Sequence, residues 1–183
     1  MNPTFDAITT LESAHLDHPM FMKQFATEMR TGLQGKRLLV LHGDNSFTEE
    51  TIQQGIPRQE AAIQTARQLN RRLVALLADE GVSALGITLS QRGFTTYDET
   101  MDPPFGVNES AWSRLPAIPV ICCATIVARS STEDRPTSII PLLLAPIRCQ
   151  RPLQQALAIP SAKPLRAPDA PVLDPASATV FAT

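Results

Sequence analysis

The chain has 183 residues, enough for one domain with its own hydrophobic core and a tail. Its residues are 43% hydrophobic and 19% charged, and its formal net charge of -2 lacks the basic excess typical of nucleic-acid-binding proteins. Prolines interrupt the longest apolar runs before they reach the length of a membrane span, and the first twenty residues do not resemble a signal peptide. We therefore expect a cytoplasmic protein without a nucleic-acid or membrane partner.

The first predicted elements are a helix and a strand. Large apolar residues recur every four positions over residues 17–34, which predicts an amphipathic helix. The apolar strand predicted over residues 37–42 ends abruptly in the polar loop "HGDNS", residues 42–46. Such an end is typical of a buried parallel strand that opens into a ligand-binding loop, and also of any strand that meets a turn.

A crossover unit is predicted next. A long helix over residues 58–80 leads to Gly81, which is expected to end it in the left-handed conformation, and then to a strand over residues 82–89. A strand, a helix and a strand in this order predict a right-handed crossover between parallel strands. Residues 90–108 are rich in turn formers and predict a loop or short hairpin, and the apolar segment 117–127 predicts a third strand.

The predicted fold class is α/β, with an open, mainly parallel three-layer sheet and an irregular Pro-rich C-terminal segment. Eleven of the sixteen prolines lie from Pro116 onward, and no glycine follows Gly106. We therefore expect an α/β domain over residues 1–128, an irregular extension over 129–159 and a disordered tail over 160–183.

Two groups of metal-ligand residue types have plainer interpretations. The adjacent Cys122 and Cys123 lie in an apolar run, where they are expected to be small buried side chains on opposite faces of a strand. His15, Asp17 and His18 lack a fourth ligand nearby, so a cluster at a helix start is the preferred interpretation. No metal site is predicted.

The loop and the elements after it resemble the amino-acid kinase family, which includes N-acetylglutamate kinase, carbamate kinase and isopentenyl phosphate kinase. The resemblance covers residues 36–123. It rests on His42, Gly43, Leu69, Asn70, Gly81, Gly86, Gly93 and the segment Ile118-Pro119-Val120-Ile121. It implies an ATP-dependent phosphotransferase acting on a small carboxylate or phosphate acceptor, with ATP and Mg as cofactors if the protein is active.

The resemblance also implies a substrate-binding set at the carboxyl edge of the sheet, where backbone N–H groups beside a helix start can hold an anion. The set is His42, Gly43, Asp44, Asn45, Ser46, Asn70 and Arg92. Each of three side chains has an alternative role. His42 either contacts a bound anion or caps the strand end through its ring nitrogens. Asn70 either reaches the acceptor or is a surface or helix-pairing asparagine, and Arg92 either meets a carboxylate or is a turn residue.

Departures from the family pattern predict impaired catalysis. Asp44 and Asn45 stand where the family commonly has glycines, and a carboxylate there repels an anion unless a cation lies between them. The family's phosphoryl-stabilising lysine has no counterpart before Met20, and its ATP site has none after Ile121. The alternatives are a kinase whose nucleotide site comes from a partner, a non-catalytic binding or homo-oligomerisation module, and a fragment of an interrupted kinase gene. A small acidic metabolite is the expected partner.

Overall fold

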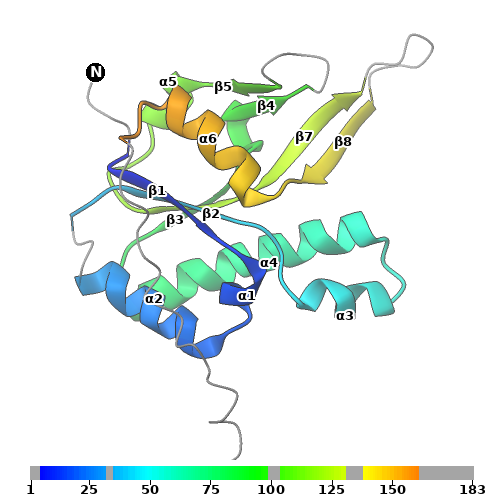
Figure 1. Cartoon of the computed structure of the whole chain (residues 1–183), viewed down its shortest axis with the longest axis horizontal. Helices are drawn as coiled ribbons and strands as arrows, with labels where there is room; N and C mark the ends of the chain where they lie inside the picture. Colours follow the sequence, from blue (N-terminus) through cyan, green and yellow to red (C-terminus); the bar gives the residue numbers. More distant parts are fainter. Residues whose placement is uncertain (1–4, 32–34, 99–103, 131–137, 161–183) are drawn as a thin grey trace, which may run out of the picture.

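The computed structural model of the chain describes residues 5–31, 35–98, 104–130 and 138–160, and every structural statement below concerns these residues. They form two four-stranded sheets with helices around them (Figure 1). The tail predicted over 160–183 lies outside the described residues, except for Pro160 itself.

Sheet A is fully parallel and has the strand order β1-β2-β6-β3. Its strands are β1 (Ala7–Leu11), β2 (Leu38–His42), β3 (Leu85–Thr88) and β6 (Val120–Cys123). The strands predicted around residues 37–42, 82–89 and 117–127 therefore share one direction in one sheet, which confirms the predicted fold class. β1, which pairs with β2 along its whole length, was not predicted.

Sheet B is mixed and has the order β5-β4-β7-β8. Its strands are β4 (Thr95–Tyr97), β5 (Phe105–Val107), β7 (Thr125–Ser130) and β8 (Ser138–Leu143). β4 and β5 are antiparallel and form the short hairpin predicted within residues 90–108. β7 pairs parallel with β4 and antiparallel with β8.

The third predicted strand, over residues 117–127, is wrong in one respect, because it divides at Ala124 into β6 and β7. The N–H of Ala124 donates to the carbonyl oxygen of His42 (2.9 Å), whereas its own carbonyl accepts from the N–H of Leu144 (3.0 Å). Ala124 thus bonds to His42 at the end of β2 in sheet A and to Leu144 directly after β8 in sheet B. The chain therefore passes from sheet A to sheet B without a loop.

Sheet A lies in the middle of three layers (Figure 1). The helices are α1 (Ser13–Leu16), α2 (Pro19–Thr31), α3 (Phe47–Gln53), α4 (Arg58–Asp79), α5 (Glu109–Ser113) and α6 (Pro146–Ala156), with a 3-10 turn η1 (Gln91–Gly93). α2 and α4 cover one face of sheet A, and α6 and sheet B cover the other. The predicted three-layer arrangement is therefore confirmed.

Both faces of β2 are buried, which explains its unbroken apolar sequence. Leu38 and Val40 pack with residues of α2 and α4, whereas Leu39 and Leu41 pack with the opposite cluster, which contains Trp112. Alternate side chains of one strand thus serve two separate hydrophobic clusters, because successive residues point to opposite faces.

The helix predicted over residues 17–34 begins two residues later than expected, at Pro19. Proline is tolerated at the first helical position, where its missing N–H has no intrahelical partner, and Pro19 occupies that position in α2. At the end of α4, Gly81 adopts a φ of 78°, and the N–H of Val82 donates to the carbonyl oxygen of Leu77 (2.8 Å). The predicted left-handed end of this helix is confirmed.

The C-terminal extension is more regular than the irregular segment that was predicted, since it contains β8 and α6. Pro141 fits into β8 because an edge strand needs bonds on one side only, and its carbonyl accepts from Gln59 Nε2 (2.5 Å). α6 begins with Pro146 and buries Cys149 and Leu153, which are four residues apart. Pro141 and Pro146 thus stand at positions that tolerate proline, whereas Pro152 lies inside α6 and removes one N–H donor from that helix.

Candidate functional site

The four strands of sheet A end at one level. The register places Leu11 opposite His42, His42 opposite Cys123, and Cys123 opposite Thr88, and these residues are the last of their strands. The loops that follow the strands therefore meet at one edge, as expected of parallel strands. This edge is where open α/β sheets bind their ligands.

His42 is fully buried at this edge, and both of its ring nitrogens have partners. Nδ1 lies 2.8 Å from the carbonyl oxygen of Gly43, and Nε2 lies 3.0 Å from Nδ2 of Asn70. A carbonyl accepts and an amide nitrogen donates, so these partners fit a neutral imidazole with its proton on Nδ1. Burial lowers the pKa of His42 to about 4, which keeps the ring neutral near pH 7. The geometry corresponds to the strand-capping interpretation, and contact with a bound anion stays a prediction.

Asn70 connects α4 to three strands of sheet A. Besides the bond to His42, its Nδ2 donates to the carbonyl oxygens of Ile121 (3.0 Å) and Ile87 (3.4 Å). The side chain is buried, with 8% of its surface exposed. Asn70 therefore holds the helix against the strand ends, and its position explains why a polar residue stands on the apolar face of α4.

Gly86 lets α4 approach this closely, and its replacement by alanine is expected to be costly. A Cβ on Gly86 would collide with Oδ1 of Asn70 and lie 3.0 Å from Cγ2 of Val74. We expect Gly86→Ala to lower the free energy of unfolding by about 2 kcal/mol in urea denaturation, as for overpacked cores. Gly43→Ala is the matched control, because its Cβ would meet Pro146 at an ordinary 3.5 Å. Equal losses for both variants would contradict the close approach at Gly86.

The loop after His42 is held by carboxylates of the chain itself. Asp44 Oδ2 accepts from the hydroxyl of Thr48 (2.8 Å). The carboxylate of Asp17 accepts from both the N–H (3.2 Å) and the hydroxyl (2.8 Å) of Ser46, at the start of α3. Asp17 thus occupies backbone and side-chain donors of the loop, a role that its sequence position near α2 did not suggest.

The His15–His18 segment forms the helix-start cluster that was expected. His15 Nδ1 accepts from the N–H of Glu12 (3.3 Å), and His18 Nδ1 accepts from the N–H of Phe21 (3.2 Å). Within the described ranges, no group of three or more His, Cys, Asp or Glu residues has the arrangement of a metal site. Cys122 and Cys123 are buried in β6 with free thiols, and burial raises the pKa of both.

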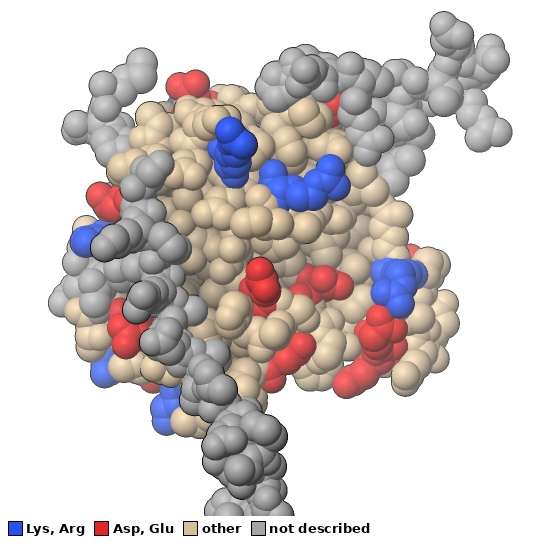
Figure 2. Space-filling model, viewed as in Figure 1, with Lys and Arg blue, Asp and Glu red and all other residues tan. Residues whose placement is uncertain are grey.

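A cleft of about 420 Å³ opens at the strand ends, between the Gly43 loop and the start of α6. Its lining residues are Thr10, Leu11, Glu12, Ser13, Gly43, Asp44, Leu143, Leu144, Ala145, Pro146 and Ile147. The charged members are Glu12 and Asp44, and among the side chains that the structure describes, no lysine or arginine lines the cleft. Figure 2 shows acidic side chains below the middle of this face and basic ones above it, over α6.

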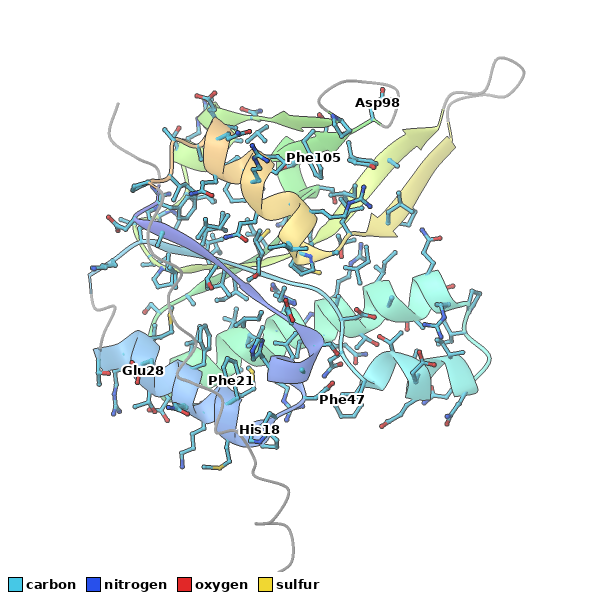
Figure 3. The ribbon with its side chains drawn as sticks, in the orientation of Figure 1. His18, Phe21, Glu28, Phe47, Asp98 and Phe105 are labelled. Atoms are coloured by element: carbon cyan, nitrogen blue, oxygen red, sulfur yellow. The ribbon has the colours of Figure 1, made fainter. Side chains whose placement is uncertain are left out.

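A smaller pocket of about 160 Å³ lies on the other side of the loop, between the start of α3 and α4. We call it the α4 pocket; its lining residues are Asn45, Phe47, Thr65, Gln68, Leu69 and Arg72. The labelled Phe47 side chain in Figure 3 projects away from sheet A at the start of α3. The loop therefore separates an acidic cleft from a pocket that contains an arginine.

The expected site residues divide between these places. Gly43 and Asp44 line the cleft, Asn45 lines the α4 pocket, and Ser46 bonds to Asp17. His42 and Asn70 lie beneath the loop as buried partners of each other. Arg92 belongs to η1, directly after β3, so its backbone lies at the same edge, but its side chain is outside the described structure. The set missed Glu12 and Arg72, because nothing in the sequence placed β1 or this face of α4 beside the loop.

No helix in the described residues is both long enough and apolar enough to cross a membrane. No protein-family model and no curated protein sequence matches the chain. A solved structure of isopentenyl phosphate kinase is similar to it, with a TM-score of 0.48 and 15% sequence identity. That similarity covers 73% of this chain and 63% of the kinase chain, so this chain spans less than two thirds of the kinase.

Proposed function

We propose that this chain is a small-molecule-binding protein, related to the amino-acid kinases through the residues around the His42-Gly43 loop, that does not transfer phosphate from ATP. The acidic lining of the cleft carries the proposal. A transferred phosphoryl group accumulates negative charge, and kinases stabilise it with lysine, arginine or Mg²⁺. Without a cation between them, Glu12 and Asp44 would instead repel it.

The loop itself supports the same conclusion. A family-like loop would offer free backbone N–H groups to an acceptor, but here the N–H of Ser46 already donates to Asp17. β1, the strand beside β2, has the sequence AITTL and contains no lysine that could reach a phosphoryl group. ATP and Mg are therefore not proposed as cofactors of this chain.

A phosphotransfer assay tests the proposal directly. The full chain is incubated with ATP–Mg and a panel of small carboxylic acids and phosphate monoesters, and ADP is measured. We expect no ADP above that formed by heat-denatured protein. ADP formation that requires both the folded chain and one acceptor would overturn the proposal and favour an active kinase. If the chain binds neither ATP nor a small acid and elutes as a stable oligomer, the assembly-module alternative replaces it.

Removing a charge from the cleft should make it more receptive to anions. We expect Asp44→Asn to bind pyrophosphate about three- to tenfold more tightly than the unmodified chain, because one repulsive carboxylate is lost. Isothermal titration calorimetry at low ionic strength measures the change. Asp79→Asn is the control, since Asp79 is the exposed last residue of α4, which leads to the opposite edge of sheet A. Equal affinities for the two variants would show that Asp44 does not repel anions at the cleft.

A further inference from the structure

The α4 pocket has one wall of regular helix and one of loop. Thr65, Gln68, Leu69 and Arg72 are separated by three, one and three positions, so they form a single stripe along α4. The opposite wall is the end of the loop, where Asn45 and Phe47 flank the first turn of α3. A rigid helix thus fixes four of the six lining side chains.

The charge of this pocket is opposite to that of the cleft. Arg72 is exposed and makes no ion pair with any described residue, and no acidic side chain lines the pocket. Glu49, two residues after the pocket residue Phe47, is already paired with Arg58 (2.8 Å). An unpaired guanidinium beside neutral donors is suited to a carboxylate, with which it forms charge-assisted hydrogen bonds.

Asn45 adds a polar group that lacks a partner in the described structure. The residue is only 5% exposed, and its Oδ1 is buried without a hydrogen bond. A buried acceptor left unpaired carries a desolvation cost, and buried polar groups are usually paired. Because this oxygen is not exposed, the Asn45 side chain would have to turn into the pocket before an N–H or O–H group of a bound molecule could pair with it.

The apolar members of the lining are Phe47 and Leu69. Phe47 is 47% exposed, which is unusual for a phenylalanine, and Leu69 is buried beside it. An exposed aromatic ring offers a face on which a flat molecule can stack.

We propose that the α4 pocket binds a small monocarboxylate that has a flat or apolar body and an N–H or O–H donor. Arg72 holds the carboxylate, Asn45 accepts from the donor, and the body lies against Phe47. The inference takes only the class of ligand, a small acid, from the proposed function. It places that acid on the α4 side of the loop, away from the acidic cleft.

Anthranilate is a suitable probe, because it has a carboxylate, an amino group and a fluorescent ring. Titrating the full chain into anthranilate should raise the fluorescence anisotropy to a plateau. We expect Arg72→Gln to weaken binding at least about tenfold, the size expected for a charge-assisted bond. Arg71→Gln, the exposed neighbour that does not line the pocket, should bind within about twofold of the unmodified chain.

A competition experiment tests the role of Asn45, and the comparison of the variants tests the pocket as a whole. Benzoate, which has no donor for Asn45, should displace anthranilate with an inhibition constant about threefold or more above the dissociation constant of anthranilate itself. Equal competition would remove Asn45 from the proposal. An absent plateau, or equal weakening by Arg71→Gln and Arg72→Gln, would overturn the pocket while leaving the absence of phosphotransfer as a separate question. Because Arg71 and Arg72 are both exposed, thermal unfolding should show all variants folded.

Discussion

Replacing Asn70 by leucine is expected to lower the free energy of unfolding by about 3 kcal/mol, although the two side chains have the same branching and the same number of non-hydrogen atoms. The substitution leaves Nε2 of His42 and the carbonyl oxygen of Ile121 buried without their donor. Each unpaired buried acceptor costs about 1–3 kcal/mol. The lost bonds also connect α4 to the ends of three parallel strands, so the helix loses its polar attachment to sheet A.

Urea denaturation followed by circular dichroism measures this loss as a shift of the midpoint. Arg71→Gln is the matched control on the same helix, and its effect should stay within about 0.5 kcal/mol because the side chain is exposed. A stability of Asn70→Leu equal to that of the unmodified chain would show that His42 and Ile121 find other partners.

Acid is expected to destabilise the chain through His42 by about 3 kcal/mol. The pKa of this residue is about 4 in the folded chain against an ordinary 6.5, mainly because burial disfavours the charged ring. Below pH 6.5 the unfolded chain therefore binds a proton that the folded chain does not bind until about pH 4. The stabilising contribution is complete above pH 6.5 and is lost as the pH falls from 6.5 to about 4.

Denaturation curves at several pH values test the assignment. Carboxylates also titrate in the acid range, so the comparison is with His42→Gln, which accepts from Asn70 but does not titrate. This variant should lose the part of the pH dependence between pH 4 and 6.5, whereas His15→Gln should keep it. An unchanged pH profile in His42→Gln would show that the buried ring is not the source.

The sheet at the centre of the fold was readable because its signals are local. β2 and α4 have unbroken or periodic apolar patterns, and Gly81 marks the helix end. β1 gave no such signal, since Thr9 and Thr10 interrupt its apolar residues and acidic residues flank it. Its pairing with β2 is set by hydrogen bonds between residues about thirty positions apart, which no local pattern reveals.

The site was harder to read than the sheet. The loop and Asn70 were expected in one substrate-binding set, and in the structure His42 and Asn70 bond to each other. Their contact with a substrate stays a prediction. The sequence did not reveal that Asp17 bonds to Ser46 or that Glu12 faces the same cleft as Asp44. Those relations arise from packing between elements, and they change the expected charge at the edge of the sheet.

The position of β6 between β2 and β3 constrains how the protein is made. On the ribosome, β2 and β3 emerge long before the segment that will bridge them. A nascent chain that ends before β6 therefore has no central strand, and two future neighbours of that strand present unsatisfied backbone edges. Folding of the complete sheet A must therefore wait until β6 has left the ribosome.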